Sequence, residues 1–174
     1  MKKILFLSIV LILNSCNKDD ADDNISNTSI DLVTGINFRQ SVDDTPLVLG
    51  NPNIYINNTF VNYPNPSNGT LYLSANATVS KVWIIPANAN KIHQQVDFNS
   101  LLNSGTYSES QIQAKSQLEL NNLNSSDLTL DLNSLNSGYY KIFIEINNNI
   151  YWDNIYLNKE GNNEVTDNII TYWN

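Results

Sequence analysis

The chain has 174 residues, a formal net charge of −8 at pH 7 and a single cysteine. This length suits one domain that buries a hydrophobic core of its own. The acidic charge is repelled by nucleic-acid phosphates, which excludes nucleic-acid binding, and one cysteine cannot form an internal disulfide.

The N-terminus has the pattern of a secretory signal. Lys2 and Lys3 precede an apolar run over residues 4–13. This run is shorter than the ~20 residues that a membrane-spanning helix needs, and its length is typical of a signal-peptide core. Because the run leads directly to Cys16, we predict a signal peptide over residues 1–15.

The sequence Leu13-Asn14-Ser15-Cys16 resembles the lipobox of bacterial lipoproteins. The resemblance implies cleavage before Cys16, acyl chains on its sulfur and new amine, and contact with the lipoprotein-processing and export machinery. Cleavage removes two lysines and no acidic residue, so the mature net charge becomes −10. Anionic headgroups repel this charge, so membrane attachment depends on the acyl chains, at ~0.8 kcal/mol per buried methylene. The alternatives are a plain signal peptide with an incidental cysteine, or an N-terminal anchor helix.

Residues 16–30 are acidic and rich in Asn, Ser and Thr, so they cannot bury enough apolar surface to offset the entropy of ordering. We predict a disordered tether here. Lys18, Asp19 and Asp20 resemble the short acidic signal that sends some lipoproteins to the outer face of the outer membrane. A calcium site at these aspartates is the alternative to a solvated linker.

From about residue 31 onward, short apolar runs alternate with turn sequences, and no long stretch keeps a helical period. A period of two along several runs is typical of antiparallel strands with one buried face. The runs are residues 54–61, 70–75, 79–85, 91–98, 118–120, 128–132, 142–146 and 150–157. This spacing predicts an all-β fold, an antiparallel sandwich of about seven strands.

Three further segments complete the predicted organisation. Residues 31–59 form an N-terminal extension with short strands on either side of a turn at 43–46. Residues 100–113 hold one short helix, with Ser108 and Gln111 at its cap. The tail, residues 160–174, is apolar enough near its end to pack on the sandwich.

A set of landmarks over residues 60–159 resembles the type A C-terminal sorting domain of type IX secretion cargo. They are Tyr63-Pro64-Asn65-Pro66, then Gly69, then Leu135-Asn136-Ser137-Gly138-Tyr139-Tyr140, and finally Lys159. The resemblance implies an immunoglobulin-like β-sandwich. It also implies one of two uses: the fold is the body of the lipoprotein, or it is a functional sorting signal.

These landmarks have physical roles of their own. Pro64 and Pro66 fix their backbone and lack an N–H donor, which makes a rigid turn. Gly69 and Gly138 can take a positive φ just before a strand. A large amphipathic ring at Tyr139 or Tyr140 can close one end of the core.

The sequence offers no catalytic set. His93 is the only histidine and lies in a predicted strand, so no nucleophile–base pair or zinc site of ordinary composition can be assembled. No phosphate loop or dinucleotide turn is present. We predict a protein that is not an enzyme and has no cofactor, metal or catalytic residues.

Aromatic residues are the remaining lead toward a ligand. If Ile142 and Ile144 face the core, strand alternation turns Phe143 outward, and if Val82 and Ile84 face the core, it turns Trp83 outward. Trp152, on the next predicted strand, is the third candidate residue of this face. Two or three exposed rings on one face would form a platform for stacking a glycan or peptide. The alternatives are that the rings belong to the core, or that the C-terminal tail or loops cover them. We therefore predict a surface-exposed outer-membrane lipoprotein with a structural or binding module. A sorting signal and a glycan- or peptide-binding lipoprotein are the alternatives.

Overall fold

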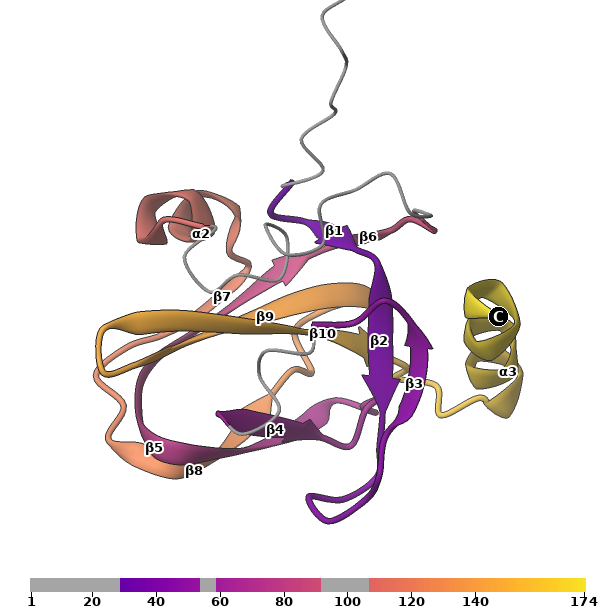
Figure 1. Ribbon diagram of the computed structural model, residues 1–174, viewed down its shortest axis with the longest axis horizontal. Helices are drawn as coiled ribbons and strands as arrows, with labels where there is room; N and C mark the ends of the chain where they lie inside the picture. Colours follow the sequence, from indigo (N-terminus) through magenta and orange to yellow (C-terminus); the bar gives the residue numbers. More distant parts are fainter. Residues whose placement is uncertain (1–28, 54–58, 92–106) are drawn as a thin grey trace, which may run out of the picture.

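The computed structural model describes residues 29–53, 59–91 and 107–174 of the chain. The strands are β1 (Leu32–Val33), β2 (Gly35–Phe38), β3 (Leu47–Gly50), β4 (Phe60–Tyr63), β5 (Thr70–Pro86), β6 (Asn88–Ala89), β7 (Leu118–Leu120), β8 (Ser125–Asp131), β9 (Gly138–Ile146) and β10 (Asn149–Leu157). The helices are α2 (Glu109–Lys115) and α3 (Asn163–Trp173). The all-β prediction is confirmed (Figure 1). The signal peptide, Cys16, the Lys18–Asp20 segment and His93 lie outside the described residues, as does all but the first residue of the strand predicted over 91–98.

The long strand β5 organises the main sheet. Its first half pairs with β4 and β8, and its second half pairs with β7 and β9, with β10 beside β9. Figure 1 shows β5 curving from the β4–β8 side to the β9–β10 side. The sequence predicted two strands here, and this was wrong. The register shifts between Ser74 and Val79, and the intervening residues hold neither Gly nor Pro, so the chain bends through an irregularity without a turn.

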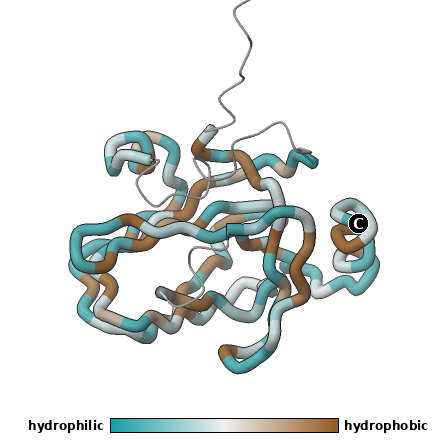
Figure 2. The backbone as a smooth tube through the Cα atoms, in the orientation of Figure 1, coloured by the Kyte–Doolittle hydropathy of each residue, from teal (hydrophilic) through white to brown (hydrophobic). Residues whose placement is uncertain are grey.

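The main core lies between the two halves of this curved sheet. Its buried residues are Phe60, Leu71, Leu73, Val79, Val82, Ile84, Leu130, Leu132, Leu135, Tyr140, Ile142, Ile144, Ile146, Ile155 and Leu157. The core residues recur at every second position of β9 and of each half of β5, and a register shift between Val79 and Lys81 separates the two halves. Figure 2 shows hydrophobic segments along the strands and hydrophilic ones in the outer turns.

The edge strands of the two halves, β4 and β10, are joined by polar side chains. Asn62 Nδ2 donates to Asp153 Oδ2 at 2.7 Å, and both residues are buried. Burial raises the pKa of Asp153 to about 7, against opposing hydrogen bonds from Asn154 and Asn62. This hydrogen bond joins β4 to β10 on the side of the curved sheet where the two edge strands face each other.

The predicted extension and tail form a second layer. The hairpin of β2 and β3 crosses the β9–β10 hairpin, and α3 lies beside it (Figure 1). Ile169 and Trp173 of α3 are buried with Val33, Ile36 and Leu49. The prediction that the tail packs on the β-domain is therefore confirmed, and this tail is helical.

The short helix predicted near residue 108 is confirmed as α2. Ser108 caps it, and the Gln111 side chain completes a capping box. Ile112 is its buried residue. Among the described residues, neither helix is long and apolar enough to cross a membrane.

Candidate ligand-binding groove

One face of the β9–β10 hairpin points away from the main core, and we call it the outer face. Three directly opposed residue pairs lie along it: Phe143 with Trp152, Lys141 with Asn154, and Tyr139 with Tyr156. They alternate with the core residues of both strands, so all six side chains share this face. The two ends of the outer face are covered differently.

The Phe143–Trp152 end, which we call the closed end, holds the predicted ligand face. Trp83, Phe143 and Trp152 lie together there, but their exposed fractions are 0%, 0% and 2%. The prediction of an exposed platform is wrong, and the alternative that other segments cover the rings holds. Among the described residues, the cluster that buries these rings includes Ile30, Tyr107 and Ile112 and no residue of the C-terminal tail.

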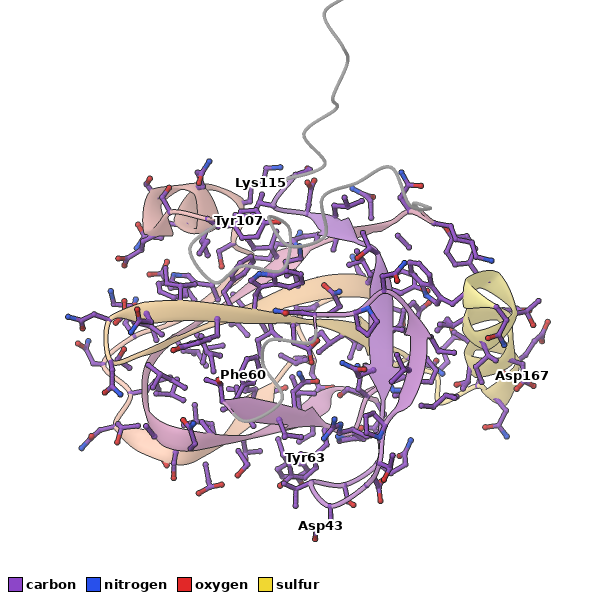
Figure 3. All side chains as sticks on the ribbon, in the orientation of Figure 1. Asp43, Phe60, Tyr63, Tyr107, Lys115 and Asp167 are labelled. Carbon is purple, nitrogen blue, oxygen red and sulfur yellow. The ribbon has the colours of Figure 1, made fainter. Side chains whose placement is uncertain are left out.

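Tyr107 is the centre of this cover. It lies next to α2, above the β9–β10 hairpin, whereas Phe60 lies below that hairpin (Figure 3). Its ring contacts Phe143 and Trp152 edge-on, with centroid distances of 5.6 and 6.3 Å. Ion pairs hold the helix in place, Lys81 to Glu109 at 2.7 Å and Lys115 to Asp31 at 3.3 Å.

Lys141 lies between the two ends and is enclosed by aromatic rings. Its exposed fraction is 1%, and Nζ lies 4.1 Å from the centroid of the Trp152 ring and 5.2 Å from that of Tyr107. Burial lowers the pKa of Lys141 to about 7, although Asp31 and Asp153 act in the opposite direction. Opposite it, the buried Asn154 Oδ1 has no hydrogen-bond partner among the residues that the structure describes. This part of the face is sealed from solvent.

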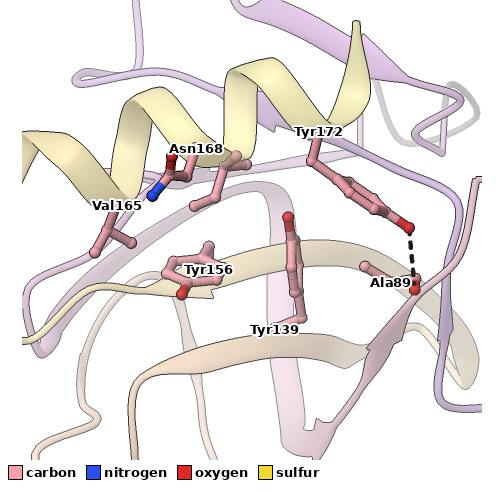
Figure 4. Close-up of a pocket in the computed structure, with 7 residues that line it drawn as sticks. Ala89, Tyr139, Tyr156, Val165, Asn168 and Tyr172 are labelled. Atoms are coloured by element: carbon pink, nitrogen blue, oxygen red, sulfur yellow. Dashed lines mark hydrogen bonds between the residues drawn. The ribbon is translucent and has the colours of Figure 1, made fainter.

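The Tyr139–Tyr156 end, which we call the open end, is part of a groove under α3 (Figure 4). The groove has a volume of about 400 Å³, within the size range of small-molecule sites. Its lining residues are Ala89, Tyr139, Tyr156, Val165, Asn168, Ile169 and Tyr172. The Tyr139 and Tyr156 rings meet edge-to-face at 4.8 Å.

The polar groups of the groove are neutral. Trp173 Nε1 donates to the Tyr139 hydroxyl at 3.0 Å, and burial raises the pKa of Tyr139 to about 12. Burial also raises the pKa of Tyr156. The Tyr172 hydroxyl donates to Ala89 O at 3.4 Å (Figure 4). In the part of the chain that the structure describes, no hydrogen bond involves the Tyr156 hydroxyl or the Asn168 side chain. The groove thus combines ring faces with available hydroxyl and amide groups.

The residues of the predicted sorting motif lie in other places. Asn65, between Pro64 and Pro66, is buried and holds three segments together. Its Nδ2 donates to Asn37 O at 2.7 Å and to Asn154 O at 3.1 Å, and its Oδ1 accepts from Tyr156 N at 2.9 Å. It is therefore a structural residue beneath the open end.

The remaining motif residues gather at one end of the sheet. Gly69 and Gly138 have φ values of 125° and 151°, as predicted, and a Cβ on Gly69 would lie 2.4 Å from Asn133 Oδ1. Lys159 Nζ donates to Asn133 O at 2.7 Å and to Leu135 O at 3.1 Å. The Tyr140 ring closes the core, and its hydroxyl donates to Asn136 O at 2.8 Å.

No known family model, curated protein or solved structure matches this chain. Within the described ranges, no group of three or more His, Cys, Asp or Glu side chains is placed to share a metal ion. The groove residues Tyr139, Tyr156, Asn168 and Tyr172 were not among the predicted ligand residues. Strand alternation across the last hairpin could have paired the first two, but the sequence did not show that the tail covers them.

Proposed function

We propose that this chain is a non-enzymatic lipoprotein of the outer membrane whose β-domain binds a ligand in the groove under α3. The observation that carries the binding role is the concave site of about 400 Å³ with three tyrosine rings and one amide. A domain that served only as a spacer would have no need of half-exposed rings around a groove, because covering them would add to its stability.

The proposed location derives from the sequence. The lipobox resemblance at Cys16 supports attachment through acyl chains, and Lys18, Asp19 and Asp20 support display on the cell surface. Fractionation of cells that produce the chain tests this step. We expect wild type in the membrane fraction and accessible to added protease on intact cells, and a Cys16→Ser variant released from the membrane. A Cys16→Ser variant that stays membrane-bound would contradict lipid anchoring.

A screen without a chosen ligand class tests the binding role. Ligand-observed NMR on the full-length chain uses a pool of oligosaccharides, short peptides and apolar fragments. Tyr172 and Tyr72 are both 43% exposed, so Tyr172→Ala in the groove has a matched control in Tyr72→Ala outside it. At least one pool member should bind wild type and Tyr72→Ala but not Tyr172→Ala. No binding, or equal binding by all three proteins, would contradict the proposal.

A second candidate function is that of a type IX sorting signal. This candidate implies that the β-domain has the topology of an immunoglobulin-like sandwich. The position of Asn133 favours this candidate, because Asn133 lies against Gly69 and accepts a hydrogen bond from Lys159, and so brings two of the motif residues together. This candidate predicts cleavage of the mature chain near residues 60–64 in cells. A chain that remains intact at the cell surface would contradict it.

A further inference from the structure

We infer that the groove under α3 takes a neutral saccharide. This inference rests on the proposed function, since it assigns a ligand class to the same groove. It is carried by three properties of the site: the charge of its lining, its available hydrogen-bonding groups, and the state of the backbone beside it.

The lining carries no formal charge. The polar side chains in it are three tyrosines and Asn168, and the tyrosines with raised pKa values remain protonated at physiological pH. The chain as a whole has a net charge of −8, so a uronic acid or phosphorylated ligand would meet repulsion with no compensating cation in the groove. A neutral ligand is therefore favoured.

The hydrogen-bonding groups suit a ligand with several hydroxyls. The Tyr139 hydroxyl accepts from Trp173, which leaves its proton to donate, and the Tyr172 hydroxyl donates to Ala89, which leaves lone pairs to accept. Asn168 adds one amide with both donor and acceptor capacity. A sugar ring presents an apolar C–H face to an aromatic ring and hydroxyls at its rim, which is the arrangement that these side chains complement.

The backbone beside the groove argues against an extended peptide as the ligand. A peptide that adds a strand needs free backbone N–H and C=O groups at a sheet edge. Here Tyr139 O accepts from Ala87 N, Tyr156 O accepts from Ser67 N, and Tyr156 N donates to Asn65 Oδ1. These groups are already bonded, so recognition depends on side chains.

Calorimetric titration of the full-length chain tests the inference. The neutral probes are maltotriose, cellotriose and xylotriose, and the competing probes are trigalacturonic acid, a proline-rich decapeptide and indole. At least one neutral trisaccharide should bind. Tyr156→Phe keeps the ring and removes the hydroxyl. It should weaken that binding about 3- to 10-fold, because one hydrogen bond to the ligand is lost. Tyr156→Ala should weaken it further, and the matched control Tyr72→Ala should leave it unchanged.

The other outcomes separate the inference from the proposed function. If only the peptide or indole binds and Tyr172→Ala abolishes that binding, the groove is a ligand site but the saccharide inference is overturned. If a trisaccharide binds equally to wild type, Tyr156→Phe and Tyr156→Ala, the sugar site is elsewhere and the inference is again overturned. If no probe binds, both the inference and the proposed binding role fail.

Discussion

The closed and open ends of the outer face carry similar aromatic residues but differ in how far those residues are buried. Both present paired aromatic rings from β9 and β10 on the same side of the hairpin. Tyr107 and α2 seal the rings at one end, whereas α3 leaves a groove beside the rings at the other. Strand alternation thus determines the face on which a ring lies, and segments distant in sequence determine whether solvent reaches it.

The largest expected effect separates the two ends by stability. Trp152→Ala at the closed end removes a ring that is 2% exposed, and should lower the free energy of unfolding by about 3–5 kcal/mol. Tyr156→Ala at the open end removes a half-buried ring and should cost about 1–2 kcal/mol. Urea unfolding of both variants measures the difference. Equal losses would mean that the two ends are covered alike.

Lys141 lies between the two ends, and removing its buried amine should change the free energy of unfolding. Lys141→Met keeps the size of the side chain and removes an amine whose solvation is lost on folding, so it should raise the free energy of unfolding at pH 7 by about 1–4 kcal/mol. Lys91→Met, at an exposed lysine, is the control and should have little effect.

The same variant has a pH dependence with a definite sign. The pKa of Lys141 is lowered from 10.5 to about 7 in the folded state, so the stability that this group contributes is present above pH 10.5 and is lost as the pH falls toward 7. The advantage of Lys141→Met over wild type should therefore be largest at pH 7 and shrink toward pH 10. Unfolding measured at both pH values checks this, and a constant difference would contradict the buried-amine account.

The position of α3 should depend on a glycine beneath it. Gly50 has a φ of +62°, and a Cβ there would lie 2.6 Å from Trp173 Cε3 and 2.7 Å from the backbone oxygen of Thr34. Gly50→Ala should lower the free energy of unfolding by about 1–3 kcal/mol and move the helix away from the groove. Gly161 also has a φ of +62° but no atom within 4 Å of an added Cβ, so Gly161→Ala isolates the backbone cost alone. Unfolding curves and Trp fluorescence compare the two, and identical behaviour would show that Trp173 does not depend on this contact.

The smallest expected effect is at Asn168, which is exposed. Asn168→Ala should change the free energy of unfolding by no more than about 0.5 kcal/mol, because its side chain makes no hydrogen bond in the described part of the chain. A thermal or urea unfolding curve is sufficient. A large loss of stability would mean that the Asn168 amide has a structural role and is not available to bind a ligand.

Local patterns predicted much of the fold. The period of two located β8, β9 and β10, and the Ser108–Gln111 capping pair located α2. The continuity of β5 was not predictable in the same way, because whether residues 75–78 turn or bend depends on partners from β4, β8 and β9. Alternation placed Trp83, Phe143 and Trp152 on the correct face. Their burial depends on Tyr107 and Ile112, which no local pattern connects to them.

NMR of the full-length chain during titration with the neutral trisaccharides, observing assigned aromatic resonances, tests the central claim most directly. The account predicts saturable shifts at Tyr156 and Tyr172 in the open end, with Phe143 and Trp152 in the closed end unchanged. Shifts at Phe143 or Trp152 without shifts at the groove tyrosines would contradict it.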